Sequence, residues 1–216
     1  MKKRGSFVCG IVLLIVFAAF TFAVTHVDVQ AIGPEGSSVG FAGINQTFHA
    51  LTDYQATVYK LTEYAGYLAL FVAGAFAGLG VAQLVKRKSL MRVDGDLYLL
   101  AGLYAIMLIC YVLFEEFIVN YRPVILEEGL EASYPSSHTM MALVILLPAI
   151  SQVGRRMKNG ALRTAVQVLL ALLLVAIVLG RLLCGVHWLT DIVAGCLLGL
   201  GLALTYEGLA SAFTKD

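Results

Sequence analysis

Six long apolar stretches separated by polar segments dominate this chain of 216 residues. An α-helix of roughly 20 apolar residues crosses the hydrocarbon core of a bilayer. The stretches cover residues 6–27, 64–85, 97–119, 138–153, 164–183 and 188–213. The pattern therefore predicts an all-α, polytopic membrane protein with six transmembrane helices. No shift in composition divides residues 1–216, so we expect a single domain.

The composition agrees with a membrane location. Hydrophobic residues make up 60% of the chain and charged residues 13%, which is more apolar surface than one soluble core of this length needs. The formal net charge of +1 gives no support for nucleic-acid binding. The four cysteines lie in or beside apolar stretches without CxxC spacing, so we interpret them as packing residues.

Basic residues fall mainly on one side of a six-span arrangement. That side would carry 12 of the 15 Lys and Arg residues, and the other side only Lys60, Arg122 and Arg181. By the positive-inside rule, both termini of this multi-pass protein of the cell membrane are predicted to be cytoplasmic. A basic start followed by an apolar run is also typical of a secretory signal peptide. The run is nearer 20 residues than 10, which favours an uncleaved span.

The longest polar segment, residues 28–63, is predicted to lie on the non-cytoplasmic side. It opens with a flexible turn and continues with roughly helical apolar spacing over residues 44–51 and 58–61. An amphipathic helix in the membrane interface and a solvated connector fit this pattern equally well. We interpret His49 and Asp53 within it as an interfacial pair rather than a functional one.

Three polar motifs lie at the ends of apolar stretches. They are Asn120-Tyr121-Arg122-Pro123, then Tyr134-Pro135-Ser136-Ser137-His138, then residues 181–191 with Arg181, His187 and Asp191. Ionisable groups at membrane depth are costly, so they suggest a function before any family is considered. The topology brings the motifs together, which places the candidate active site at the non-cytoplasmic ends of helices 3 to 6.

The residue types in these motifs suit a phosphate pocket. Arg122 and Arg181 each offer a planar fork of N–H donors that matches phosphate oxygens. The hydroxyls and backbone N–H groups of Ser136 and Ser137, at the start of a helix, add a second anion site. Ser136 is equally suited to be the cap of that helix.

Two histidines complete this pocket. His187 and Asp191 are four residues apart, which on a helix places both on one face and lets the carboxylate orient the imidazole. In covalent phosphoryl transfer, one histidine attacks phosphorus and a second one protonates the departing oxygen. His138 is available for the second role.

These motifs resemble those of the type 2 phosphatidic acid phosphatase superfamily, whose signature is KxxxxxxRP, then PSGH, then SRxxxxxHxxxD. The chain has Glu115-x6-Arg122-Pro123, then Pro135-Ser136-Ser137-His138, then Gly180-Arg181-x5-His187-x3-Asp191. The spacing inside all three motifs is kept, and the resemblance covers roughly residues 60–210.

The resemblance implies a role for each matching residue. His187 would be the nucleophile that forms a phosphohistidine, Asp191 would fix its tautomer, and His138 would be the general acid. The phosphoryl oxygens would be held by Arg122, Arg181 and Ser136 with backbone N–H groups near Ser137. Since the arginines supply the positive charge, no metal and no other cofactor is expected.

The chain departs from the signature at three positions. Ser137 replaces glycine, Gly180 replaces serine, and Glu115 replaces the lysine of the first motif. Glu115 is seven residues before Arg122, about two helical turns back on the same face. It could pair with an arginine, meet a hydroxyl or amine of the substrate, or form an acidic patch with Glu116 at the membrane interface.

Other residues near the motifs receive structural interpretations. Tyr134 and Trp188 are predicted to be aromatic residues of the membrane interface. The acidic residues between the first two motifs, Glu127, Glu128 and Glu131, are predicted to form a solvated loop.

The function that the resemblance implies is metal-independent hydrolysis of a lipid phosphomonoester or pyrophosphate on the outer membrane face. Undecaprenyl pyrophosphate, phosphatidylglycerol phosphate and phosphatidic acid are candidate substrates. Two alternatives stay open: a lipid-to-lipid phosphotransferase, and a catalytically silent protein that binds or transports lipid phosphates. The expected partners are the lipid substrate and the bilayer, and a homo-oligomer is also allowed.

Overall fold

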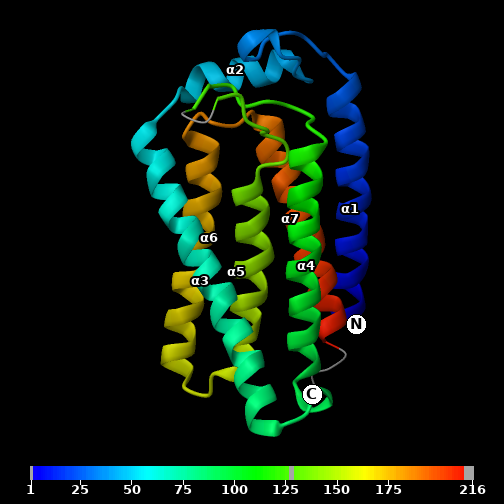
Figure 1. The fold of residues 1–216 in the computed structure, drawn as a ribbon, viewed down its shortest axis with the longest axis vertical. Coiled ribbons are helices and arrows are strands. Elements are labelled where there is room, and N and C mark those ends of the chain that lie inside the picture. The colour runs from blue at the N-terminus through cyan, green and yellow to red at the C-terminus, as the bar shows by residue number, and fades with distance from the viewer. Residues whose placement is uncertain (1, 127–128, 212–216) are drawn as a thin grey trace.

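The structure, a computed structural model, describes residues 2–126 and 129–211 and is built almost entirely of helices (Figure 1). Seven α-helices follow one another in this part of the chain: α1 (Lys2–His26), α2 (Ala42–Thr52), α3 (Ala56–Arg87), α4 (Gly95–Glu116), α5 (Ser137–Arg156), α6 (Gly160–Leu183) and α7 (Leu189–Ala210). Two 3₁₀ turns, Pro34–Gly36 and Leu90–Arg92, lie in the connections. Among the described residues only isolated β-bridges occur, and no strand.

Six of these helices are long and apolar enough to cross a membrane, which confirms the predicted fold class of a multi-pass helical protein. In the most apolar stretch of each span, 56% of the residues of α5 and 50% of those of α7 are buried inside the protein. In the other four spans this share is 17% or less. In Figure 1, α5 and α7 accordingly occupy the middle of the bundle, with α1, α3, α4 and α6 around them.

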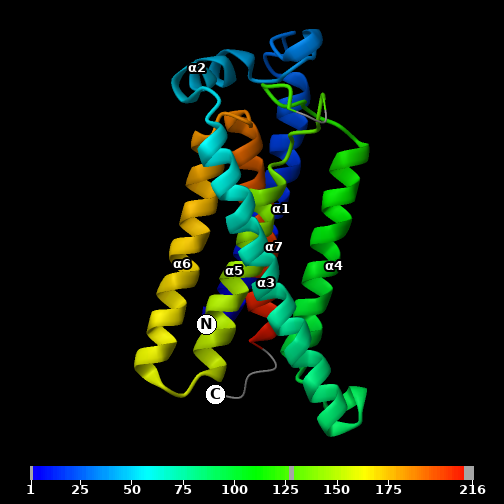
Figure 2. The ribbon, with the colours of Figure 1, turned by 60° about the vertical axis from the view of Figure 1, so that its left-hand side comes forward.

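Helix α3 crosses the bundle obliquely (Figure 2). It lies beside α6 at the end of the bundle that carries α2, and it approaches the start of α4 at the opposite end. We call the end of the bundle that carries α2 the site end, because the three motifs lie there. We call the opposite end of the bundle the basic end, because it carries Arg87, Arg155 and Arg156. Helices α3 and α4 therefore diverge towards the site end.

A polar network ties α4 to α5 at the basic end. Arg156 donates to Asp94 Oδ2 at 2.8 Å, to Asp96 Oδ1 at 2.7 Å and to Gln152 Oε1 at 2.8 Å. Gln152, which is fully buried, donates in turn to Asp96 Oδ2 at 3.0 Å. Because the buried carboxylate of Asp96 is satisfied by these donors, the network fixes the beginning of α4 against the end of α5.

Close packing brings the start of α7 against the start of α5. A Cβ atom on Gly195 would lie only 2.9 Å from the carbonyl oxygen of Ser136, so α7 needs glycine at this position. The backbone N–H of Ser136 donates to the carbonyl oxygen of Asp191 at 3.0 Å. The second and third motifs are thereby held together by backbone contacts.

The helix boundaries differ from the predicted ones at two places that matter for the site. Helix α3 begins at Ala56, eight residues before the predicted start of the second span, so it carries Glu63. Helix α4 ends at Glu116 rather than at residue 119, and the chain from residue 117 to Arg122 is not helical. The expectation that Glu115 and Arg122 share one helical face is therefore wrong.

The polar segment after α1 contains the helix α2, as one of the two interpretations predicted. Its fully buried Asn45 donates to Thr190 Oγ1 at 2.9 Å and accepts from the Thr190 backbone N–H at 3.1 Å. The ring of His49 packs on Trp188, with 5.4 Å between ring centroids, rather than forming a pair with Asp53. Helix α2 is thus attached to the first turn of α7.

Candidate active site

The described residues between α4 and α5, 117–126 and 129–136, are non-helical and carry the first motif and the start of the second across the site end. The backbone N–H of Arg122 donates to the carbonyl oxygen of Glu131 at 3.0 Å, and that of Ser133 donates to the carbonyl oxygen of Asn120 at 2.9 Å. Antiparallel pairing of Tyr121 with Ala132 accompanies these bonds. Glu127 and Glu128, two members of the predicted solvated loop, lie outside the described residues.

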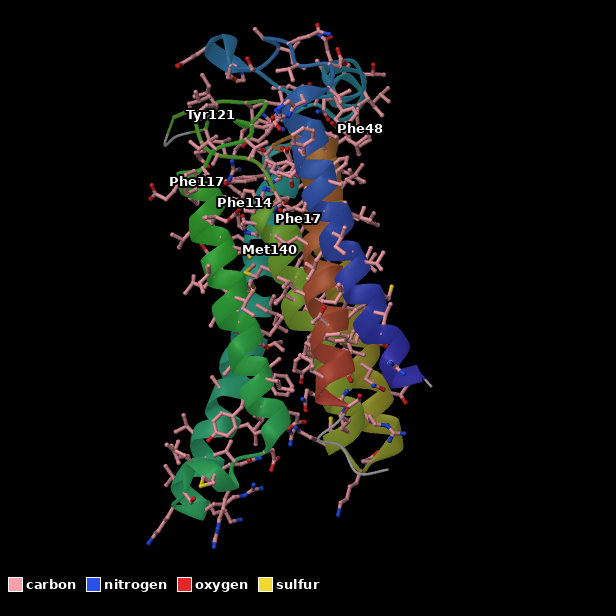
Figure 3. All side chains as sticks on the ribbon, turned by 90° about the vertical axis from the view of Figure 1, so that its right-hand side faces the viewer. Phe17, Phe48, Phe114, Phe117, Tyr121 and Met140 are labelled. Atoms are coloured by element: carbon pink, nitrogen blue, oxygen red, sulfur yellow. The ribbon has the colours of Figure 1, made fainter. Side chains whose placement is uncertain are left out.

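An aromatic cluster anchors the second motif to the helices beside it, and two of its members, Phe17 and Phe114, are labelled in Figure 3. Tyr134 packs between Phe17 of α1 and Phe114 of α4, with ring centroids 6.4 Å and 6.0 Å away. Its hydroxyl lies 2.7 Å from Thr21 Oγ1. Tyr134 and Trp188 are 2% and 3% exposed, so both are packed inside the protein and neither faces the lipid as a belt aromatic, contrary to the prediction.

Ser133 connects His187 to Asp191. The Ser133 hydroxyl donates to Asp191 Oδ2 at 2.6 Å and lies 2.9 Å from His187 Nδ1. Asp191 Oδ2 is 3.8 Å from the same nitrogen, which is too far for a hydrogen bond. His187 also precedes α7 instead of lying on it. The expected helical pairing of the two residues is therefore replaced by a bridge through Ser133.

This bridge decides which nitrogen of His187 is free. Because the only hydroxyl proton of Ser133 goes to Asp191, the serine oxygen accepts from a protonated Nδ1. The lone pair of the neutral ring then lies on Nε2, which is buried and has no hydrogen-bond partner among the described residues. Burial lowers the pKa of His187 to about 4, so the ring is neutral at pH 7.

Asp191 is itself fixed by three segments of the chain. It accepts from Ser133, from Asn120 Nδ2 at 3.1 Å and from the backbone N–H of Trp188 at 2.9 Å. Asn120 and Ser133 are 1% and 3% exposed. Neither residue has a predicted role, although Asn120 lies inside the first motif and Ser133 directly before the second.

Both predicted phosphate-binding arginines are paired with glutamates. Arg122 NH2 lies 3.0 Å from Glu131 Oε2. The prediction that Glu131 belongs to a solvated loop is therefore wrong. Arg181, which is fully buried, forms an ion pair with Glu63. In each arginine the Nε and NH1 atoms are buried without a partner among the described residues.

Glu63 also reaches the second histidine. One of its carboxylate oxygens lies 3.4 Å from His138 Nε2. The His138 ring fits against α3 because Gly66 leaves room: a Cβ atom there would lie 3.0 Å from His138 Cδ2. Glu63 was not among the predicted site residues, because it was placed in the polar segment before the second span. The apolar spacing at residues 58–61 was the available signal that α3 begins earlier.

The remaining predicted residues lie close to the histidines. Ser136 is fully buried at the N-cap position of α5, but its hydroxyl makes no cap bond and has no partner in the described part of the chain. Ser137 begins α5 and lines the cavities at the site end. Glu115 lines the larger cavity, and no described residue forms an ion pair with it within 4.0 Å.

Two cavities meet at His138. The larger, about 690 Å³, is polar and is lined by residues that include Lys60, Glu63, Glu115, Arg122 and Glu131. The second, about 300 Å³, extends between α3, α4 and α5 over mainly apolar side chains, among them Leu70, Met107, Leu108 and Met141. Both are lined by Glu63, Tyr111, Ser137 and His138. A polar space and an apolar one therefore share the residues around His138.

In residues 2–126 and 129–211, no three His, Cys, Asp or Glu side chains converge in a way that could hold a metal ion. The groups that gather at the site are instead two histidines, two arginines and hydroxyls. His187 and His138 both lie within electrostatic range of Arg122 and Arg181. This arrangement is suited to binding an oxyanion beside an imidazole.

The fold and the site thus define a six-span helical membrane protein with a histidine–arginine centre at one end of the bundle. The family model of the PAP2 superfamily matches residues 97–211, and the chain belongs to this superfamily. A search of curated proteins gave no match.

A solved structure extends the likeness to the whole fold. The chain is similar to the first transmembrane PAP2 type phosphatidylglycerolphosphate phosphatase from Bacillus subtilis, known from a crystal structure. The two chains are 17% identical with a TM-score of 0.69, and the likeness covers 95% of this chain and 98% of the other.

Proposed function

We propose that the protein is a lipid phosphatase that hydrolyses a phosphomonoester or diphosphate of a membrane lipid through a phosphohistidine. One observation carries the proposal: Ser133 leaves Nε2 of His187 as the free, buried lone pair in the field of two arginines whose Nε and NH1 atoms lack partners among the described residues. A phosphoryl group bound there would meet a nucleophile and its oxyanion donors together.

The proposed reaction has two steps. Nε2 of His187 attacks phosphorus while the bond to the lipid oxygen breaks, and His138 gives its proton to that leaving oxygen. A water molecule then attacks the phosphohistidine, His138 takes a proton from it, and inorganic phosphate leaves. During both steps the Nδ1–H of His187 stays on Ser133, and Asp191 offsets the positive charge of the ring.

The apolar cavity supports a lipid as the substrate. It begins at His138 and runs along α3 and α4 over side chains that suit a hydrocarbon chain. The relative of known structure is described as a phosphatidylglycerolphosphate phosphatase, so phosphatidylglycerol phosphate is one candidate. Phosphatidic acid and undecaprenyl pyrophosphate are the other two.

The proposed orientation places the site at the outer face of the membrane, with both termini in the cytoplasm. Most basic residues lie in segments at the basic end, opposite the motifs, as the positive-inside rule requires for this orientation. Labelling of single cysteines placed in α2 and in the turn after α3 in intact cells would test it.

The proposed activity is tested with purified protein in detergent and EDTA, offered the three candidate lipids. We expect release of inorganic phosphate that survives chelation and disappears in His187→Ala. Absence of release from every lipid would contradict the proposal and favour a binding or transport protein. Transfer of labelled phosphate between lipids without release would identify a phosphotransferase.

A further inference from the structure

Glu63 is an acidic residue in contact with two of the groups that are proposed to handle phosphate. Its carboxylate is bound to Arg181 NH2 and lies 3.4 Å from Nε2 of His138. The proposed reaction needs Arg181 to hold phosphate and His138 to protonate the leaving oxygen. Glu63 lies in none of the three motifs, yet it contacts a group from two of them.

The burial of Arg181 explains why a carboxylate is needed there. Arg181 is 0% exposed, and the ring of Tyr59 covers its guanidinium carbon at 5.0 Å. A buried guanidinium without a counter-ion is strongly unfavourable. Glu63 supplies this counter-ion while no phosphate is bound, and the Nε and NH1 atoms of Arg181, which have no partner among the described residues, remain as donors for phosphate oxygens.

Glu63 has space to move, whereas Arg181 has none. The Glu63 side chain is 27% exposed and lines both cavities at the site end. Lys60, three residues earlier on α3, lines the larger cavity and offers a cation for the displaced carboxylate. A phosphate group brings more charge and more acceptor oxygens than a carboxylate, so it can compete for Arg181.

We propose that Glu63 is a displaceable positioning residue: it holds Arg181 and His138 in place in the empty site and gives way to phosphate. This inference rests on the proposed phosphatase function. Its carboxylate keeps the guanidinium and the imidazole in place before substrate arrives. When inorganic phosphate leaves, the carboxylate returns to Arg181 and opposes rebinding of the product.

The test is the affinity of the full-length protein in detergent for inorganic phosphate, measured by titration calorimetry. In Glu63→Gln we expect phosphate to bind about tenfold more tightly, because no charged competitor has to leave Arg181. With lipid substrate, KM should fall and kcat should fall as well, since inorganic phosphate that binds Arg181 more tightly leaves the site more slowly. A purely structural role for Glu63 would lower stability without tightening phosphate binding.

Glu116→Gln is the matched control. It removes the same charge at the same end of the bundle, but Glu116 is not among the residues that line either cavity. We expect its phosphate affinity to stay within about twofold of the unmodified protein. An equal gain in both variants would overturn the inference, because the effect would then be a general one of charge.

Unchanged or weaker phosphate binding in folded Glu63→Gln also overturns the inference. Glu63→Ala serves as a second variant, and failure of both variants to fold would assign Glu63 a structural role instead. If Glu63→Gln binds phosphate more tightly but the unmodified protein hydrolyses no lipid, the proposed function is contradicted and the inference stands. Lipid hydrolysis with unchanged phosphate affinity would do the reverse.

Discussion

The hydroxyl of Ser133 stands between His187 and Asp191, 2.9 Å from the imidazole Nδ1 and 2.6 Å from the carboxylate Oδ2. Asp191 therefore orients the histidine through a serine, and its remaining oxygen is held by Asn120. The segment between α4 and α5 thus takes part in setting the tautomer of a residue that lies before α7.

Ser133→Ala should lower kcat by about 10–100-fold with little change in KM, because a residue that orients a reacting group acts mainly on the chemical step. Steady-state kinetics with a lipid phosphate measure both values. Ser151→Ala is the control, since Ser151 bonds Glu207 far from the site, near the basic end. An unchanged kcat in Ser133→Ala would mean that the serine does not position His187.

The protonation of His187 gives a second prediction. Burial favours the neutral ring and lowers its pKa to about 4, so the nucleophile should persist as the pH falls below 6.5 and be lost only near pH 4. Magnetic resonance of labelled imidazoles can follow this titration, because the chain has only 4 histidines and His187→Ala identifies the signal. Titration of the His187 signal near pH 6.5 in the folded protein would show that this ring is not buried as described.

Glu115→Lys restores the residue type of the family signature. The new ammonium group would face the polar cavity near Arg122 and Glu131, so we expect KM for a short-chain lipid phosphate to fall by up to about tenfold. Glu116→Lys controls for the change in net charge. A collapse of activity in folded Glu115→Lys would instead show that Glu115 itself recognises the substrate.

Arg156→Leu tests the network at the basic end. It leaves the buried Asp96 and its neighbour Asp94 without their common donor, which should cost about 1–3 kcal/mol of unfolding free energy. Thermal unfolding in detergent would record this as a lower Tm. Arg92→Leu, at an exposed position of the same end, should leave the Tm nearly unchanged. Equal Tm values for both variants would show that the network does not stabilise the bundle.

The six spans could be predicted because membrane helices need continuous apolar stretches, and that constraint is written directly in the sequence. The grouping of the histidines and arginines at one end followed from motif spacing and topology. Ser133, Asn120 and Glu63 could not be found in this way. The roles of Ser133 and Asn120 depend on how the segment after α4 folds back, which tertiary contacts set. Glu63 was hidden because the apolar spacing at residues 58–61 was assigned to the polar segment and not to the start of α3.

Glu115 illustrates the same limit. Its spacing from Arg122 suggested one helical face, but α4 ends at Glu116 and the chain turns before Arg122. A helix end at the membrane surface is fixed by local hydrogen bonds, which hydropathy does not report. The apolar spacing therefore placed the helix correctly and its end wrongly.

The central claim is that Nε2 of His187 takes the phosphoryl group. The most direct measurement is rapid acid-free quenching of the purified protein during turnover of a phosphate-labelled lipid, followed by mass spectrometry of its peptides. The account predicts a phosphoryl group on His187 that is stable in base, labile in acid and absent from His187→Ala. Continued release of phosphate by His187→Ala, or label on another residue, would contradict it.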